Sequence, residues 1–122
     1  MTYSAQRILD ETDLRQLQYM MESASTAIAF AKDQTPEKLF SDNKRVFALV
    51  RAIELVGESA ASISPMAKRY YPNFPWSYAA GISERFSFND SDINLDRVWL
   101  TVTQELPVLV TKLSRIIPPE FR

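Results

Sequence analysis

The stretch SDNKRVFALVRAIELVGESAASIS, residues 41–64, decides the fold of this 122-residue chain. Its apolar residues recur at spacings of three and four, which predicts an amphipathic helix that Ser41 or Asp42 caps. One apolar stripe consists of Leu49, Ile53, Val56, Ala60 and Ile63. A second stripe beside it begins with Phe47, Val50 and Gly57. A helix with two apolar stripes is expected to have neighbours on two sides.

Gly57 is the unusual residue of this helix. In a helix interior glycine is less favourable than alanine by about 1 kcal/mol. Its presence therefore suggests a crossing at which another backbone comes close, and close packing is the simplest reason for it.

The remaining segments also show helical spacing. A first helix follows Asp10 or Thr12 as its cap, and a single turn is expected at residues 36–40. Ser64 and Pro65 open a short helix through Tyr70, and Pro75 can start a fourth helix that extends as far as Phe86. Asn94 caps a last long helix, in which Pro107 removes a backbone hydrogen bond and predicts a kink near Leu106.

These elements predict an all-α fold, an antiparallel helical bundle of four to five helices formed by residues 1–122 as a single domain. The chain has no cysteine, so a reducing cytoplasm is the expected setting. Residues 1–10 lack the basic segment followed by an apolar core that is typical of a secretory signal peptide, so no export is expected. No apolar run is long enough for a membrane span. The net charge of −1 gives no global attraction to phosphate, and histidine is absent.

Several short segments together carry a resemblance to a known family. In the second long helix they are residues 41–42, 48–51 and 56–60; further along they are 74–76, 80–82, 93–94, 98–99 and 106–107. In this order and spacing they are similar to the HepT family of the HEPN superfamily, and the resemblance covers roughly Leu14 to Ile117.

This resemblance implies a helical bundle that pairs into a homodimer and acts as a metal-independent RNA endoribonuclease without a cofactor. Such proteins are toxins of type VII-like toxin-antitoxin modules. A cognate MNT-type nucleotidyltransferase antitoxin holds them in check. The family motif is Arg-Asn, a few residues, then His, with a Tyr two positions later that can receive AMP from the antitoxin. Two copies of the motif share one cleft in the dimer.

The motif positions of this chain all depart from that pattern. With Trp76 and Trp99 as anchors and no insertion, Ser83 stands where the family has Arg and Glu84 where it has Asn. Phe88 then replaces the His, and Asp90 replaces the Tyr. Metal-free RNA cleavage needs a base for the 2′-hydroxyl proton and a cation beside the phosphate. We therefore predict a catalytically impaired family member that keeps the dimer and the antitoxin docking surface.

Two alternatives remain open from the sequence. Glu84 and Arg85 could replace the lost base and cation, which would leave an RNA-cleaving toxin. The chain could instead be a non-enzymatic structural or regulatory helical dimer. In either case Trp76, Phe88 and Trp99 are the candidates for the dimer interface, since aromatic residues are enriched in interfaces.

Two further sequence patterns concern the binding of a metal ion and of RNA or a partner. Residues 90–94 resemble the first half of a calcium loop, but Leu95 and Thr101 stand where such a loop needs Gly and Glu, so no metal is predicted. The cluster Lys68-Arg69-Tyr70-Tyr71 could contact RNA or a partner, although a solvated face is the commoner role of such residues. RNA contact is expected to be local and weak.

Overall fold

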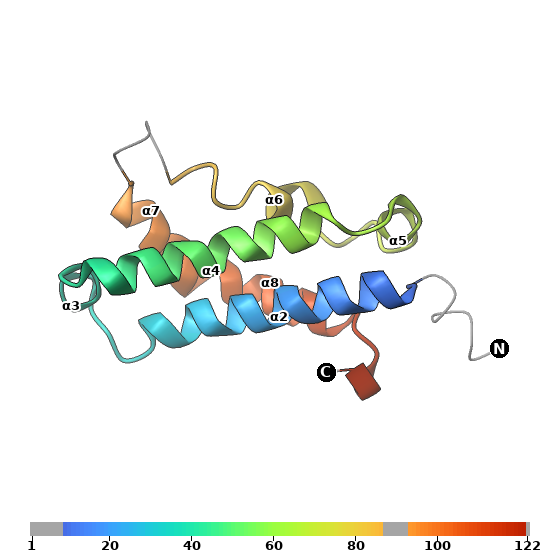
Figure 1. Cartoon of the computed structure of the whole chain (residues 1–122), viewed down its shortest axis with the longest axis horizontal. Coiled ribbons are helices and arrows are strands. Elements are labelled where there is room, and N and C mark those ends of the chain that lie inside the picture. The colour runs from blue at the N-terminus through green and yellow to red at the C-terminus, as the bar shows by residue number, and fades with distance from the viewer. Residues whose placement is uncertain (1–8, 87–92, 122) are drawn as a thin grey trace.

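The computed structural model describes residues 9–86 and 93–121. Two long antiparallel helices form the framework of the fold (Figure 1). Helix α2 (Glu11–Ala31) packs along α4 (Asn43–Ala61), and the single turn α3 (Pro36–Phe40) lies between them in the chain. Asp10 caps α2 by accepting the Asp13 amide at 2.7 Å. Asp42 caps α4 by accepting the amides of Lys44 and Arg45.

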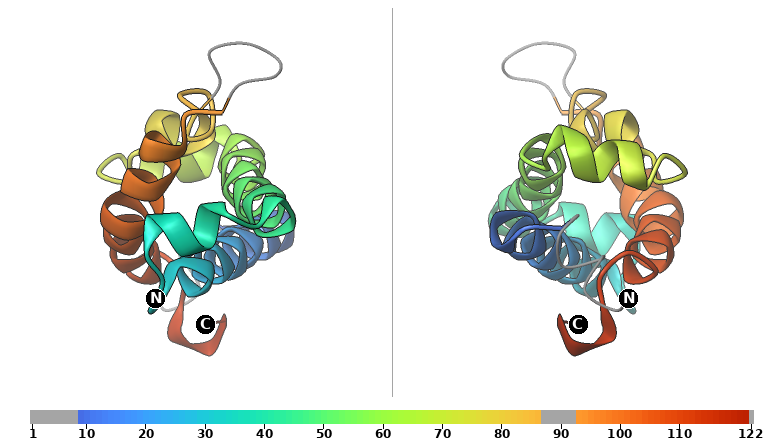
Figure 2. Two further views of the ribbon diagram at one scale, coloured as in Figure 1. Left: turned by 90° about the vertical axis from the view of Figure 1, so that its left-hand side faces the viewer. Right: turned by 90° about the vertical axis from the view of Figure 1, so that its right-hand side faces the viewer.

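The second half of the chain covers this pair. It contains α5 (Pro65–Tyr70), α6 (Trp76–Ala80), α7 (Leu95–Leu100), the π-helical segment η1 (Thr101–Glu105), α8 (Leu106–Ser114) and a 3-10 turn η2 (Pro119–Phe121). Helix α6 packs on α4, whereas η1 and α8 pack on α2. Viewed end-on, the helices surround a common centre (Figure 2). The predicted all-α helical bundle is confirmed.

The core is made mainly of aliphatic side chains from every long element. In the helix that decided the fold the first stripe is buried, whereas in the second stripe Phe47 is 67% exposed and Val50 is only partly buried. The largest fully buried side chains of the core are those of Leu9, Leu17, Met20, Leu39, Leu49, Ile53, Val56, Phe86, Val98, Leu106, Leu113 and Ile117. Among the described residues, no helix combines the length and the hydropathy that crossing a membrane requires.

One buried carboxylate ties the start of α2 to the start of α5. Asp13 is almost fully buried. It accepts the Ser64 amide at 2.8 Å and the Ser64 hydroxyl at 2.6 Å. The same hydroxyl accepts the Ala67 amide at 3.2 Å and so caps α5. This buried charge is stabilised because its oxygens are hydrogen-bonded.

The fourth helix is shorter than its sequence predicts. Extension to Phe86 is wrong: α6 ends at Ala80, and the backbone then continues in turns through residues 81–86. The Glu84 amide donates to the Gly81 carbonyl and the Phe86 amide to the Ser83 carbonyl, both at 3.1 Å. No side chain caps α6, and glycine at position 81 disfavours continuation.

The position near Leu106 at which a kink was predicted contains the π-helical segment η1. The Leu106 amide donates to the Thr101 carbonyl five residues earlier, which is π-helical pairing. Pro107 follows directly and has no amide to donate, while its ring crowds the preceding turn. The wider turn relieves this crowding without ending the helix.

Gly57 lies at the close crossing that its position in the helix predicted. A Cβ atom at this residue would lie 2.9 Å from the Ala80 carbonyl oxygen and 3.4 Å from that of Ala79. Both atoms belong to the backbone of α6, so neither can rotate away. Gly57 therefore sets the distance between α4 and α6.

We expect Gly57→Ala to lower the free energy of unfolding by about 1–3 kcal/mol, because α6 must shift to admit the methyl group. Urea denaturation followed by circular dichroism measures the change. The matched control is Ala48→Gly on the exposed side of α4. It isolates helix propensity and should cost about 1 kcal/mol. A Gly57→Ala variant more stable than the parent would contradict the crossing.

Candidate functional site

The motif positions fall on the segment that leaves α6. Ser83 and Glu84 lie in the turns after this helix, whereas Phe88 and Asp90 lie outside the described residues. The Asn94 amide donates to the Phe86 carbonyl at 2.5 Å, so the two described ends flanking the motif region meet. Asn94 also caps α7 by accepting the Arg97 amide at 3.0 Å. This part of the chain is thus anchored on α6 at one side and α7 at the other.

A polar group lies directly beside this anchor, and we call Tyr78, Arg97, Thr101 and Glu105 the Glu105 cluster. Glu105 accepts the Tyr78 hydroxyl on Oε1, and its Oε2 pairs with Arg97 Nη2 at 3.0 Å. The Thr101 hydroxyl lies 3.5 Å from Oε1. The charged side chains are only 24% and 25% exposed for Arg97 and Glu105, so solvent screens their attraction weakly.

The π-helical segment makes this cluster possible. Arg97 and Glu105 are eight residues apart, and eight residues of regular α-helix rotate a side chain by about 80° beyond two full turns. The extra residue in the π turn reduces that rotation and directs Glu105 toward the face that carries Arg97. A partly buried ion pair and a partly buried phenol hydrogen bond then join α6 to the last helix.

Tyr78 holds its proton firmly in this setting. Its pKa is raised well above the ordinary value, first by burial and then by the hydrogen bond to Glu105. The nearby guanidinium groups of Arg85 and Arg97 oppose the shift. At neutral pH the phenol is therefore a hydrogen-bond donor and not a nucleophile.

The two substitute residues considered from the sequence have different neighbours. The Arg85 guanidinium carbon lies 5.1 Å from the centre of the Tyr78 ring, a cation–π contact. A Glu84 carboxylate oxygen instead lies beside Gly81, 3.1 Å from where a Cβ of that residue would be. Both side chains are exposed. Their joint action as base and cation stays a prediction.

The Glu105 cluster has little capacity to act as a base or to bind a phosphate, because its charged groups already pair with each other. Glu105 already accepts from a phenol and a guanidinium, and the charge of Arg97 is offset by Glu105. Within residues 9–86 and 93–121, no group of three acidic, histidine or cysteine side chains could hold a metal ion. The cluster borders a cavity of about 340 Å³, to which Pro75, Gln104 and Val108 also contribute.

The aromatic candidates for the dimer interface are used differently within the chain. Trp76 is 9% exposed; its indole donates to the Tyr71 carbonyl at 2.9 Å, and its ring lies 4.4 Å from that of Phe74. Trp99 is partly buried and meets Phe40 edge-on at 6.2 Å. Phe88 lies outside the described residues. Their role in an interface stays a prediction.

Sequence reasoning missed Tyr78, Arg97 and Glu105 as a group. The available signal was weak: Glu105 stands directly before Leu106 and Pro107, where a disturbed helix was expected. The direction in which a disturbed turn rotates its side chains depends on the packing around it. The periodicity of one helix does not contain that information.

The long antiparallel pair, the short α5 and α6, and the last helix broken at η1 define an all-α bundle of the HEPN kind. The family model described as Ribonuclease HepT-like matches residues 8–116. The chain therefore belongs to the HepT-like ribonuclease family.

Relatives with assigned names agree with this family. The chain is 28% identical over 100 residues to the "Probable ribonuclease HepT" of Thermococcus cleftensis, covering 79% of this chain and 91% of the relative. It is 24% identical over 110 residues to a protein of Methanocaldococcus jannaschii that is named as an RNase, covering 89% and 91%. No solved structure matches the chain.

We expect the stability of the fold to fall as the pH rises above about 10, the ordinary pKa of tyrosine. The folded pKa of Tyr78 lies higher than the unfolded one, so its contribution is complete below the unfolded pKa and is lost as the pH rises toward the folded one. Urea unfolding between pH 8 and pH 11 measures the slope. Tyr78→Phe should flatten it.

Tyr19→Phe, at a half-exposed site on α2, is the matched control and should leave the slope unchanged. Some slope should persist in Tyr78→Phe, because burial also raises the pKa of Tyr71. An identical slope in the parent and in Tyr78→Phe would show that the Tyr78 phenol does not hold its proton through the fold.

Proposed function

We propose that this chain is a HepT-like toxin-family protein of a type VII-like toxin-antitoxin module whose ribonuclease activity is lost or strongly impaired. It acts as a homodimer that docks an MNT-type nucleotidyltransferase antitoxin. Membership of the HepT-like ribonuclease family and the ribonuclease names of the relatives support the toxin-family part of this proposal.

The observation that carries the impairment is the absence of histidine from all 122 residues. Imidazole is the side chain best suited to take and give protons near neutral pH. Loss of general acid-base help costs roughly 10²–10⁴ in rate. Ser83 at the family's Arg position adds to that loss, because a serine hydroxyl carries no charge to stabilise the phosphate in the transition state.

The pairing of the nearby charged groups supports the same conclusion. Arg97 is neutralised by Glu105, and Arg85 lies on the Tyr78 ring. Recruiting either guanidinium to a phosphate would break a contact that joins α6 to its surroundings. The backbone contact between Phe86 and Asn94, on either side of the undescribed residues, supports the part of the proposal that the fold around the motif positions is kept.

A second candidate function is RNA cleavage by other residues. The exposed Glu84 and Arg85 favour it, because they stand in the motif region and provide one carboxylate and one guanidinium. A carboxylate in water is a weak base at neutral pH. This candidate therefore ranks below the impaired toxin-family protein.

We expect the purified chain to cleave RNA far more slowly than a family member with an intact motif, and its expression should not arrest growth. The combined variant Ser83→Arg, Glu84→Asn, Phe88→His and Asp90→Tyr should recover both cleavage and toxicity. Single replacements should do little, because the base and the cation act as one unit. Gel assays on a labelled RNA and growth curves are the measurements.

The control for the second candidate is Glu84→Ala combined with Arg85→Ala. If the parent cleaves RNA well and this control does not, the alternative residues are the catalysts. Strong cleavage by the parent that persists in this control would contradict both candidates. A combined restoration variant that folds but stays inactive would show that the scaffold no longer supports the family's chemistry.

We expect a homodimer in solution at micromolar concentration, because exposed apolar side chains remain on several elements. Phe47 is 67% exposed on α4, and Leu100 and Val108 are 41% and 53% exposed on the last helix. Apolar side chains that form one contiguous patch mark an interface, and we expect exposed side chains of this chain to form such a patch in the dimer. Light scattering measures the mass. Phe88→Glu should weaken the dimer, whereas Met66→Glu, an exposed site on α5, is the matched control. A monomeric parent would contradict the prediction.

A further inference from the structure

One cavity of the described residues is lined by none of the described motif positions. It has a volume of about 490 Å³ and is formed by the segment that follows α5 and by the end of α8. Helix α5 and helix α7 lie at opposite ends of the long helical pair (Figure 1). Its lining includes neither Ser83 nor Glu84 nor a member of the Glu105 cluster, although Lys112 also lines the cavity of about 340 Å³ beside Tyr78 and Glu105.

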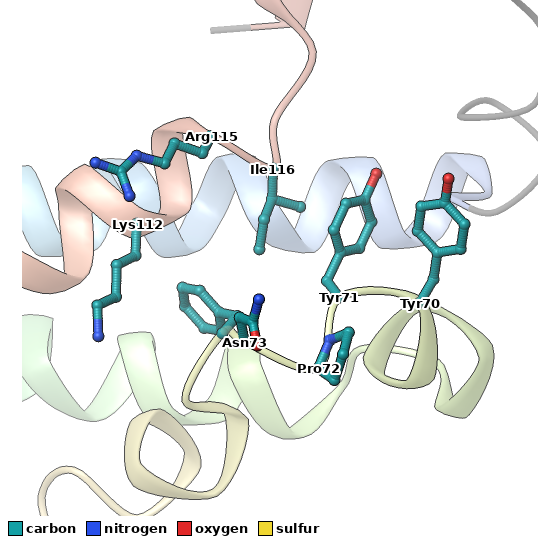
Figure 3. A pocket seen from close by; sticks show the side chains of 8 residues that line it. Tyr70, Tyr71, Pro72, Asn73, Lys112, Arg115 and Ile116 are labelled. Carbon is teal, nitrogen blue, oxygen red and sulfur yellow. The ribbon is translucent and has the colours of Figure 1, made fainter.

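Two kinds of side chain line this cavity, and they lie on opposite sides of Ile116 (Figure 3). Lys112 and Arg115 come from the end of α8 and lie on one side, while Tyr70 and Tyr71 lie on the other, with Asn73 between them (Figure 3). The two tyrosine rings meet edge-on at 4.9 Å. The lining thus offers cations at one end and aromatic surface at the other.

Among residues 9–86 and 93–121, no acidic side chain neutralises the cations of this cavity. No described lining residue carries a carboxylate. No ion pair of the described residues includes Lys112 or Arg115, and the same holds for Lys68 and Arg69 on the adjoining α5. Elsewhere the exposed Arg15, Arg45 and Arg51 each have an acidic partner on their own helix. Lys112 and Arg115 of the lining, with Lys68 and Arg69 on the adjoining α5, thus bring four basic side chains without a described ion pair to this region.

Two hydrogen bonds to its carbonyl fix the backbone of Tyr71 on the aromatic side of the cavity. The Tyr71 carbonyl accepts the Trp76 indole at 2.9 Å, and the Phe74 amide donates to the same carbonyl at 3.2 Å. Tyr71 itself is partly buried, whereas Tyr70 is 54% exposed. A fixed backbone keeps the ring of Tyr71 at the cavity wall, so a flat ligand ring would not need to order it first.

We propose that this cavity binds a nucleoside phosphate, with the phosphate at Lys112 and Arg115 and the base against the tyrosine side. Arginine and lysine are the side chains that bind phosphate, and bases stack on aromatic rings in a manner that tolerates any sequence. A volume of this size suits a small ligand. The source of the nucleoside phosphate is either a free nucleotide or the end of an RNA strand.

Titration of the four nucleoside 5′-monophosphates, one at a time, tests the proposal. Amide and side-chain NMR shifts on the full chain should saturate, and the shifts should be confined to residues 68–76 and 112–116. Arg115→Gln alone should weaken binding severalfold, and Lys112→Gln with Arg115→Gln should weaken it at least about tenfold, because two charge-assisted contacts are lost. Lys38→Gln with Lys44→Gln, exposed and distant on α3 and α4, is the matched control.

A second pair of variants tests the aromatic half. Tyr71→Phe keeps the ring and should retain affinity, whereas Tyr71→Leu removes the ring and should lose severalfold. Thermal melts establish that each variant is folded. Inorganic phosphate binding as tight as that of the monophosphates would overturn the assignment of a base to the tyrosine side.

A 5′-phosphorylated oligoribonucleotide distinguishes the two sources. Competition between the oligonucleotide and a monophosphate, with equal sensitivity to the Lys112 and Arg115 changes, would support the end of an RNA strand. Saturation by monophosphates alone would support a free nucleotide. No saturable binding of either, or binding that the double variant leaves unchanged, would overturn the proposal. Neither result depends on RNA cleavage, so the ribonuclease proposal stands or fails separately.

Discussion

Pro107 imposes the constraint on which the packing of the last helix against α6 depends. The last helix must continue past a residue without an amide, and η1 is the solution: the Leu106 amide reaches back to Thr101. That wider turn directs Glu105 toward Arg97 and Tyr78, which joins the last helix to α6. Since α6 leads directly into Ser83 and Glu84, the placement of these two motif positions depends on a proline more than twenty residues further along the chain. Gly57 completes the arrangement from the other side, because only a residue without Cβ lets α6 lie so close to α4.

The parts of the fold that follow from local chemistry could be predicted from the sequence. Proline at the first helical position marked both Pro36–Phe40 and Pro65–Tyr70, and Asp10, Asp42 and Asn94 act as the expected caps. Two features escaped prediction because they depend on packing between distant segments. The end of α6 at Ala80 reflects where that helix meets α4. The bond between Tyr78 and Glu105 spans 27 residues and arises only after the last helix has been rotated by η1.

Charge is distributed unevenly over the molecule, although the sum is close to zero. At the motif end, Arg97 and Glu105 cancel each other in a half-buried setting, where separating them would leave a poorly solvated charge. At the other end, Lys112 and Arg115 face a cavity with no carboxylate in its described lining. Cations at the end of α8 also complement the negative end of the helix dipole, which stabilises them although no acidic side chain of the described residues pairs with them. A phosphate would thus be attracted to the α8 end of the molecule rather than to the position of the family motif.

An active ribonuclease of this family must both hold the motif segment in place and carry the reacting groups on it, and different residues serve these two requirements. Holding the motif segment requires the crossing at Gly57, the Glu105 cluster and the contact between Phe86 and Asn94, and all of these contacts are made by side chains and backbone outside the motif itself. Cleaving RNA requires a base and a cation at four positions on that segment. Because the supporting contacts do not involve the reacting groups, the reacting groups can change without loss of the fold. The absence of histidine is therefore compatible with the observed fold, and a surface formed by the supporting elements does not depend on the residues at the motif positions.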